Sequence, residues 1–382
     1  MTWLITGGAG YIGAHVVRAL AAAGHATVVF DDLSTGKKSR LSADVPLVVG
    51  SILDRDLLAS TIREYEIAGV VHLAAKKSVA ESVENPELYE RTNVLGTETV
   101  LAAAHAGGVR YFVNSSSAAV YGESGIARVA ESDVAIPASP YGATKLAAEG
   151  IVNRYRALGM ATCSLRYFNV AGSVAVELRD DSVANLFPII LRNIEAHERP
   201  KIFGNDYETP DGTCIRDYVH VRDIADAHLI AAEMLVKGEL PAVMNIGTGT
   251  GSSVLEVVRT LLDLTGSSLE PEFVERRAGD IGELVADVSL ARRVLKRRRH
   301  PQRRHLQRKL PQRRRRRPRS QPPRSSALAI QSRIDSLRRS PRSKVMARTQ
   351  ALVQQVLVVF VVRNLKRISH RCSAANLAAN SL

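Results

Sequence analysis

The sequence predicts an α/β protein built on a doubly wound parallel sheet, followed by a smaller α/β lobe and a disordered basic tail. Three observations support this fold class. Short apolar runs alternate with helical patterns over residues 1–170, the runs are apolar almost throughout, and a glycine-rich segment follows the first of them. Strands that alternate with helices form right-handed βαβ units. Strands that are apolar throughout are buried on both faces of a parallel sheet.

The elements of the first 170 residues follow in order. Two amphipathic stretches are typical of helices, His15–Ala23 and Thr97–His105. Residues 171–295 are less regular; they contain several turn clusters and one helical pattern, Val254–Leu264. The predicted strands are Trp3–Thr6, Ala26–Phe30, Leu47–Val49, Val70–Leu73, Tyr111–Asn114 and Cys163–Tyr167.

The charge of the chain divides it into two unlike parts. The 382 residues carry a net charge of +14, but residues 297–382 hold 24 of the 52 Lys and Arg and one of the 38 acidic residues. Their net charge is therefore +23, and that of residues 1–296 is −9. An acidic body with a basic tail does not indicate a nucleic-acid-binding fold.

Cysteine usage and hydropathy set further limits. Cys163, Cys214 and Cys372 show no CxxC spacing, so neither a metal site nor a disulfide framework is expected. Such usage fits a reducing cytosol. The N-terminus lacks the pattern of a signal peptide. The apolar run Val356–Val362 is too short to span a bilayer.

The first candidate site is the glycine loop that follows the first predicted strand. Gly7 permits a tight turn, Gly10 lets the backbone approach a pyrophosphate, and Gly13 lets the next helix pack closely. The N-terminal N–H groups of that helix would then face the phosphates. Asp31 ends the second strand, where a carboxylate accepts hydrogen bonds from the adenosine ribose and repels a 2′-phosphate. The loop therefore predicts NAD binding; an ordinary glycine-rich turn is the alternative.

The second candidate site is the segment Ser139–Lys145. Ser139 and Pro140 are typical of a helix start, which places Tyr141 and Lys145 on one face, four residues apart. A neighbouring ammonium and an oxidised nicotinamide would lower the pKa of the phenol, so Tyr141 is a candidate general acid/base. Ser117 follows a predicted strand and could share the proton of the reacting oxygen. A surface Tyr and Lys on an amphipathic helix is the alternative.

These residues resemble the extended short-chain dehydrogenase/reductase family. Within it, residues 1 to about 295 are similar to the 4-epimerases that act on UDP-glucose. IFGNDYETPDGTCIRDYVHV is the most specific segment, whereas the glycine loop and YxxxK are shared by many activities. The other matching segments are TGGAGYIGAH, HLAAKKSVAESV, NSSSAAVYGES, SPYGATK, LRYFNVAG and RRAGD.

The resemblance implies a role for each matching residue. Residues 1–170 would form an NAD-binding Rossmann domain and residues 171–295 a lobe that binds the UDP-sugar, with a homodimer possible. Tyr141, Lys145 and Ser117 would be catalytic, and Lys145 would also bond the nicotinamide ribose. NAD would be held by Gly7, Gly10, Tyr11, Ile12, Gly13, Asp31, Asp32, Ile52, Lys77, Asn93, Tyr141, Lys145 and Phe168. The substrate would contact Ser117, Asn169, Asn185, Phe203, Arg216, Arg277 and Asp280.

The chemistry of the substrate set agrees with this. Arg supplies a planar fork for a diphosphate, and Phe203 offers an apolar surface to the uracil. The alternative for Arg216 is an ion pair with Asp217 or Asp223.

The implied reaction is an epimerisation without net redox. Tyr141 would take the proton of the sugar 4-hydroxyl while C4 loses a hydride to NAD, and the 4-keto sugar would turn before the hydride returns. A nucleotide-sugar 4,6-dehydratase is the rival, but the acidic pair that such enzymes carry is replaced by Ala118 and Ala119. The basic tail keeps two rival interpretations open, a polyanion-binding protein and an inactive chain.

Some residues depart from the family pattern. Ser51 replaces an Asp near the adenine, and Ala119 replaces a Thr. Leu284 aligns with the position that controls which size of sugar the family members accept. The largest departure is residues 296–382, where resemblance ends. We interpret this tail as an out-of-frame translation; the alternative is a basic arm that contacts nucleic acid or other polyanions non-specifically.

Overall fold

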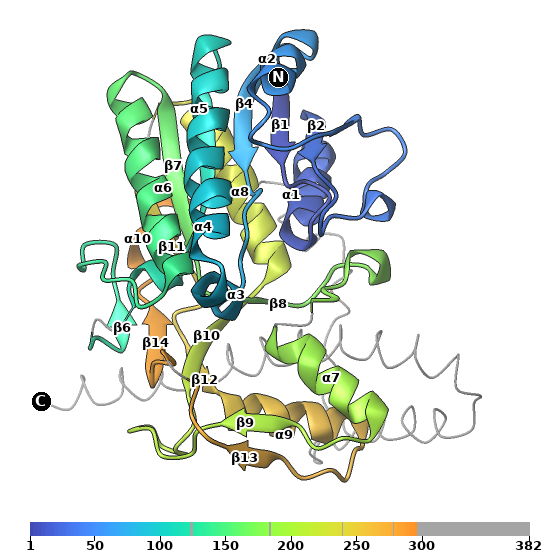
Figure 1. Cartoon of the computed structure of the whole chain (residues 1–382), viewed down its shortest axis with the longest axis vertical. Coiled ribbons are helices and arrows are strands. Elements are labelled where there is room, and N and C mark those ends of the chain that lie inside the picture. The colour runs from blue at the N-terminus through green and yellow to red at the C-terminus, as the bar shows by residue number, and fades with distance from the viewer. Residues whose placement is uncertain (123–124, 183–184, 239, 278, 296–382) are drawn as a thin grey trace, which may run out of the picture.

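The computed structural model describes residues 1–295 except 123–124, 183–184, 239 and 278. The basic tail lies outside the described residues, so its expected disorder, altered reading frame and polyanion binding stay predictions. The larger sheet has seven parallel strands in the order β11-β7-β5-β4-β1-β2-β3 (Figure 1). They are β1 (Thr2–Thr6), β2 (Ala26–Asp31), β3 (Leu47–Val49), β4 (Ile67–His72), β5 (Tyr111–Ser117), β7 (Ala161–Tyr167) and β11 (Val243–Ile246).

This strand order confirms the predicted doubly wound fold. The order reverses between β1 and β4, and in such sheets ligands bind outside the carboxyl ends of the strands at that switch point. Each strand predicted from the sequence overlaps an observed one. β5 continues three residues past the predicted end, to Ser117, so that three consecutive serines close this central strand.

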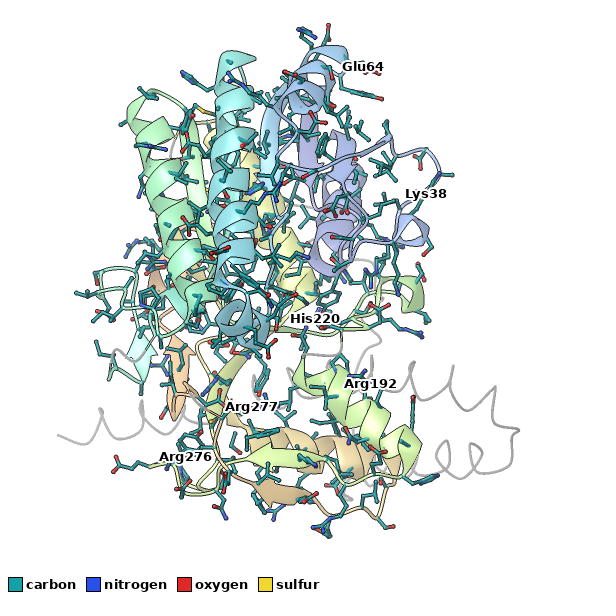
Figure 2. All side chains as sticks on the ribbon, viewed as in Figure 1. Lys38, Glu64, Arg192, His220, Arg276 and Arg277 are labelled. Carbon is teal, nitrogen blue, oxygen red and sulfur yellow. The ribbon has the colours of Figure 1, made fainter. Side chains whose placement is uncertain are left out.

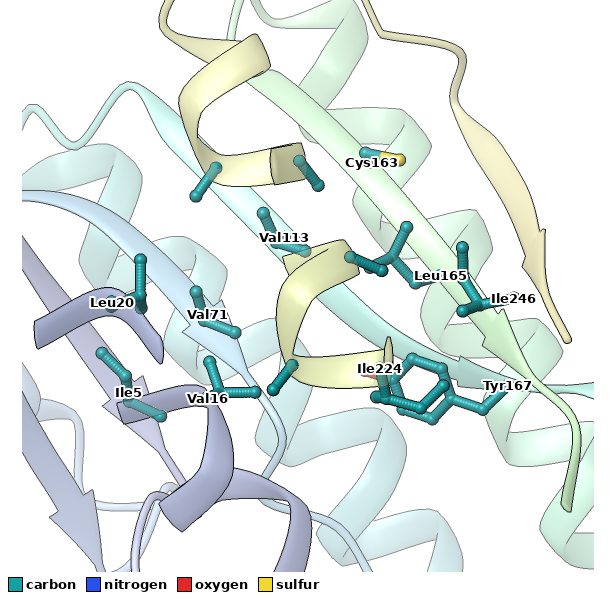
Figure 3. Packing of buried hydrophobic residues seen from close by; sticks show 14 of the residues in the cluster. Ile5, Val16, Leu20, Val71, Val113, Cys163, Leu165, Tyr167, Ile224 and Ile246 are labelled. Atoms are coloured by element: carbon teal, nitrogen blue, oxygen red, sulfur yellow. The ribbon is translucent and has the colours of Figure 1, made fainter. Parts of the chain in front are cut away.

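Helices cover both faces of the larger sheet. α1 (Tyr11–Ala22) and α8 (Val221–Leu235) pack on one face, with Ile5 and Val113 of the strands among their contacts (Figure 3). The other face carries α2 (Arg55–Glu64), α5 (Gly96–Ala106) and α6 (Pro140–Ala157), which pack against Leu4 and Phe112. Successive strand residues point to opposite faces, so continuous apolar runs are required here.

The smaller part of the molecule lies beyond the carboxyl ends of these strands (Figure 1). One sheet has the order β12-β10-β14-β6, with β8 paired to β10, and β13 pairs with β9. Two helices, α7 and α9, bury Ile190 and Leu261 against β9. The bounds are β6 (Arg128–Val129), β8 (Asn169–Ala171), α7 (Leu186–Ala196), β9 (Lys201–Phe203), β10 (Ile215–His220), β12 (Gly251–Ser253), α9 (Val254–Thr265), β13 (Glu272–Val274) and β14 (Glu283–Ala286).

Short helical segments complete the described chain. A π-helical segment, η2 (Glu90–Leu95), joins α4 to α5, and such segments occur frequently at functional sites. The others are η1 (Lys38–Arg40), α3 (Val79–Glu84), α4 (Pro86–Tyr89), η3 (Ala118–Val120), η4 (Val176–Leu178) and α10 (Ser289–Leu295).

Two elements from beyond residue 170 return to the larger sheet. α8 packs beside α1, and β11 pairs with β7 at the sheet edge. The sequence indicates one helix in residues 171–295, whereas the structure has α7, α8, α9 and α10 there. The buried side of α8 is rich in alanine, which weakens its apolar periodicity in the sequence. Within the described ranges no helix combines the length and apolarity needed to cross a membrane.

Candidate functional site

The glycine loop joins β1 to α1 at the carboxyl edge of the larger sheet. Gly7 has φ +70°, a conformation that L side chains rarely adopt. A Cβ on Gly13 would lie 2.1 Å from the carbonyl oxygen of Gly7, so only glycine lets α1 pack on the loop. Gly10 caps α1 without any side-chain hydrogen bond, which leaves the first N–H groups of the helix available to a phosphate.

Asp31 connects this loop to the end of β2. Its Oδ2 accepts a hydrogen bond from Ala9 N at 2.9 Å, and its Oδ1 accepts one from Leu33 N at 2.9 Å. Burial raises the pKa of Asp31 above its ordinary value, although these two bonds oppose the shift. Each carboxylate oxygen keeps a second acceptor site. Asp32 is exposed and accepts a hydrogen bond from Ser34 N.

The segment 172–181, which we name the strap, lies against the start of α1. Tyr11 Oη donates to the carbonyl oxygen of Gly172 at 2.5 Å. Arg40 Nη2 donates to Asp181 Oδ1 at 2.6 Å, and Lys37 also pairs with Asp181. Burial raises the pKa of Tyr11 well above its usual range. The strap therefore ties the glycine-loop region to the segment after β2.

Other predicted cofactor residues line the same edge. Asn93 on η2 is buried; its Oδ1 accepts from Lys76 N at 2.8 Å and its Nδ2 donates to Thr144 Oγ1 at 3.1 Å. Asn93 thus fixes the segment after β4 to α6. Lys77, next in the chain, is exposed. Ile52 is buried against α5, and Ile12 is half-buried against the core.

Ser117, Tyr141 and Lys145 come together where β5 meets the start of α6. Ser139 Oγ accepts from Gly142 N at 3.2 Å, which confirms the predicted helix start. The Ser117 hydroxyl lies close enough to Tyr141 to lower the pKa of its phenol. Lys145 Nζ donates to the carbonyl oxygen of Ser115 at 2.9 Å and is 7 % exposed. The three side chains therefore occupy one small volume at the carboxyl end of a central strand.

The electrostatics of this group differ in part from the expectation. Burial raises the pKa of Tyr141, and the nearby Ser117 hydroxyl opposes that effect. The pKa of Lys145 is lowered to about 8 by burial, although Glu149 opposes the shift. The expected lowering of the phenol pKa is therefore not produced by the chain alone, because loss of solvent is the largest effect on this phenol.

The group is linked to the glycine loop through a buried histidine. His72, at the end of β4, bonds Thr6 Oγ1 at 2.7 Å and Thr97 Oγ1 at 3.1 Å. Burial, together with a smaller effect of Lys145, lowers the pKa of His72 to about 3. Because Thr6 directly precedes Gly7, His72 connects the end of β1 to Thr97 on α5.

The predicted substrate residues of the smaller part form a second cluster. Arg216 Nη2 lies 3.8 Å from Asp280 Oδ1. The guanidinium carbon of Arg277 lies 3.6 Å from the centre of the Phe203 ring, so Arg277 covers the surface expected to receive a uracil. Figure 2 shows Arg276 and Arg277 beside β9 and β13. Two arginines and an aromatic ring thus gather where a diphosphate and a base are expected.

The remaining predicted substrate residues lie apart from this cluster. Asn169 starts β8 and is exposed, and Phe168 is buried beside Leu284. Asn185 caps α7, and its Nδ2 donates to Asp180 Oδ2 at 2.5 Å. The structure therefore brings together the arginines, Asp280 and Phe203, and leaves Asn185 on the strand-to-helix connection that follows the strap.

Asp217 is a residue that the sequence reasoning did not assign to the site. It is completely buried, and its Oδ1 accepts from Thr248 N at 2.8 Å and its Oδ2 from Gly249 N at 2.8 Å. Ala286 N donates to the same Oδ2 at 3.3 Å. Asp217 thus holds β10, the loop before β12 and β14 together, directly beside Arg216. An acidic residue within a strand pattern is the signal that could have identified it.

Comparison with known proteins agrees with this geometry. Residues 3–247 match the NAD dependent epimerase/dehydratase family. The chain belongs to this family. The residues present fit its cofactor, because the start of α1 has no side-chain cap and Gly10 carries no side chain there, which suits a pyrophosphate.

Individual members of the NAD dependent epimerase/dehydratase family are similar along most of their length. The UDP-glucose 4-epimerase of Azospirillum brasilense is 42% identical over 297 residues, which are 76% of this chain and 85% of that protein. A UDP-glucose-4-epimerase from Stenotrophomonas maltophila, solved with bound NAD and formylated UDP-arabinopyranose, aligns with a TM-score of 0.74 at 38% identity. That alignment covers 78% of this chain and 92% of the other.

A third relative is similar over nearly the same share of the chain. The UDP-glucose 4-epimerase from Brucella ovis in complex with NAD aligns with a TM-score of 0.73 at 39% identity, over 77% of this chain and 92% of the other. These likenesses confirm the predicted family resemblance and the predicted fold class.

Proposed function

We propose that this protein interconverts UDP-glucose and UDP-galactose with NAD as a resident cofactor. The observation that carries the proposal is the proximity of Ser117 to Tyr141, with Lys145 one turn further along α6, at the sheet edge that also holds the glycine loop. The similar UDP-glucose 4-epimerases support the choice of substrate.

The chain supplies binding and proton transfer. The start of α1 holds the pyrophosphate of NAD, and Asp31 accepts from the adenosine ribose. Ile52, Lys77 and Asn93 complete the cofactor site as the resemblance implies. Bound NAD supplies a hydride acceptor and a positively charged ring. Arg216 and Arg277 bind the diphosphate of the substrate, because a guanidinium forms paired bonds with phosphate oxygens.

Tyr141 is the group that moves the proton. Its Oη takes the proton of the sugar 4-hydroxyl as C4 is oxidised and returns it when C4 is reduced. Ser117 Oγ shares that hydrogen bond, and Lys145 favours the phenolate. The sugar must turn between the two half-reactions, so the UDP carries the binding energy while the hexose is held loosely.

Expression of the full chain tests the proposal. NAD should co-purify with the protein, and added UDP-galactose should yield UDP-glucose. Tyr141→Phe should retain NAD and lose turnover by about 10²–10⁴-fold, the usual contribution of a general acid/base. A stable 4-keto-6-deoxy product would indicate a dehydratase instead, and near wild-type turnover by the variant would remove Tyr141 from its role.

We also propose that two copies associate, and that the reaction takes place in the cytosol. Exposed apolar side chains on the stretch from α3 to η2 support association; Val83 is 64 % exposed and Leu95 53 %. The free buried thiols of Cys163 and Cys214 fit a reducing compartment. Light scattering should give twice the chain mass, and a monomer mass that persists at high concentration would contradict association. Non-specific contact of the tail with nucleic acid stays a separate prediction.

A further inference from the structure

A buried ion pair lies one helical turn beyond Lys145. Glu149 on α6 is 3 % exposed and Arg166 on β7 is 6 % exposed. Arg166 Nε donates to Glu149 Oε1 at 2.9 Å, and its Nη2 donates to Oε2 at 2.7 Å. Two parallel bonds of this kind fix both orientation and distance. The pair therefore sets how α6 sits on β7.

The same carboxylate also reaches the end of β5. Ser116 Oγ donates to Glu149 Oε1 at 2.5 Å. Ser116 stands between Ser115, whose carbonyl oxygen accepts from Lys145, and Ser117, whose hydroxyl lies near Tyr141. One bond from Glu149 thus constrains the strand residue that separates the two contacts.

Arg166 also contacts the segment that follows β5. Its guanidinium carbon lies 4.8 Å from the ring centre of Tyr121, and Tyr121 Oη donates to Asn245 Oδ1 at 2.7 Å. Tyr121 ends the turn η3, which starts directly after Ser117. Arg166, the register partner of Ser116 on β7, therefore supports the strand end from the same face of the sheet and also contacts the turn that follows it.

Fold stability alone is a weak reason for this pair. Removing two charges from water costs several kcal/mol, and well-packed apolar residues often replace a buried ion pair at no loss of stability. The pair is, however, the feature that connects α6, β5 and η3 around the reacting groups. Its place in the fold points to a role in the reaction.

We propose, on the basis of the function proposed above, that Glu149 and Arg166 are positioning residues for Ser117, Tyr141 and Lys145. The geometric effect passes through Ser116 and Tyr121 to the end of β5. The electrostatic effect acts on Lys145, because Glu149 raises the pKa of that lysine against the lowering caused by burial. An opposite charge nearby favours the charged form of a buried group.

Other ionisable groups also lie on α6 and on the elements around it. Among all of these groups, Glu149 is the one that raises the pKa of Lys145. The others are Glu81 and Glu84 on α3, Glu87 and Tyr89 on α4, Glu90 and Arg91 on η2, Glu98 and His105 on α5, Tyr111 on β5, Tyr121 after η3, Cys163, Arg166 and Tyr167 on β7, Tyr141, Arg154, Tyr155 and Arg156 on α6 itself, and His72 at the end of β4.

The test compares three variants of the full chain. In Glu149→Gln/Arg166→Met both charges are removed together, so no buried charge is left unpaired. Ser116→Ala removes the single bond between Ser116 and Glu149. Glu98→Gln is the matched control, because Glu98 pairs with Arg154 further along α6, away from Lys145.

Two readouts separate positioning from simple stabilisation. The first is the pH titration of the Lys145 ¹³Cε resonance in lysine-labelled protein. Lys145→Met identifies that resonance. The titration midpoint should fall by about one pH unit in the double variant, a tenfold change in the protonation equilibrium. The second readout compares the changes in kcat and in KM for UDP-galactose. We expect kcat to fall about 10–100-fold in the double variant and several-fold in Ser116→Ala, with KM little changed. Such a pattern is expected when only the geometry of the transition state is disturbed.

The outcomes are distinct. A folded double variant that keeps the wild-type midpoint and kcat overturns the inference, and so does wild-type kcat in Ser116→Ala if the double variant fails to fold. A shift of equal size in Glu98→Gln also overturns it, because any carboxylate on this side would then suffice. If the wild-type chain lacks epimerase activity, the proposed function fails, while the Lys145 titration still decides whether Glu149 acts on the lysine.

Discussion

Replacement of Lys145 by Met should change how stability depends on pH. Burial lowers the pKa of Lys145 from 10.5 to about 8. Between these two values the unfolded chain binds a proton at this site that the folded chain does not, so the free energy of unfolding rises with pH. At 1.36 kcal/mol for each unit of pKa, this one group adds roughly 2–3 kcal/mol to the stability between pH 7 and pH 10.

Lys145→Met has no titrating side chain at this position. Other groups contribute equally to both proteins, so the difference between their unfolding free energies isolates Lys145. We therefore expect the advantage of Lys145→Met over the wild type to be largest near pH 7 and to shrink by roughly 2–3 kcal/mol towards pH 10. The loss of the bond to the Ser115 carbonyl oxygen lowers the stability of the variant by an amount that does not depend on pH.

Urea titrations followed by circular dichroism at a series of pH values measure the free energy of unfolding. The slope of that free energy against urea concentration is compared between the two proteins, to check that both expose the same surface on unfolding. Two curves that stay parallel from pH 7 to pH 10 would refute the reasoning, since they would mean that Lys145 titrates alike in the folded and unfolded chain. Turnover of Lys145→Met should be lower throughout, because the phenolate of Tyr141 loses its nearest cation.

Three further changes test other parts of the site. Gly13→Ala places a Cβ 2.1 Å from a loop carbonyl oxygen, so it should destabilise the fold by about 1–3 kcal/mol and abolish co-purification of NAD, measured by absorbance after denaturation. Asp217→Asn replaces one of the two acceptor oxygens by an NH2 donor that faces backbone N–H donors, which should cost about 1–3 kcal/mol and raise KM for UDP-galactose; unchanged KM would contradict its link to the substrate lobe. Asp181→Asn removes the ion pairs with Lys37 and Arg40, so NAD should dissociate faster from the variant. The rate is followed by dilution into an assay that degrades free NAD, and an unaltered rate would show that the strap plays no part in holding NAD.

Local patterns in the sequence predict most of the larger sheet and the start of its key helix. The strand Leu47–Val49 is observed as predicted, and α6 begins at Pro140 with Ser139 as its cap. These features depend on residues close in the chain, namely the apolar runs and a capping side chain. The glycine loop is equally local, and its turn and close packing follow from glycine geometry at Gly7 and Gly13.

Contacts between distant segments are the part that the sequence does not predict. Asp217 reaches Thr248 and Ala286, and Asp181 reaches Arg40 across 141 positions of the chain. No spacing rule connects such residues, because their proximity depends on the order of the strands. The sequence does mark Asp217 indirectly, since a carboxylate within a strand pattern must be paired when it is buried.

The electrostatics of Tyr141 also depend on burial, which local spacing does not predict. The spacing of Tyr141 and Lys145 indicates a cation beside a phenol, but spacing carries no information on burial. Both groups lose their solvent, and loss of solvent favours the neutral form of each, so it raises the pKa of the phenol and lowers that of the amine. The chain alone therefore holds a neutral tyrosine beside a readily deprotonated lysine. Since Glu149 raises the pKa of Lys145, that carboxylate favours the cation on which the proposed proton transfer by Tyr141 relies.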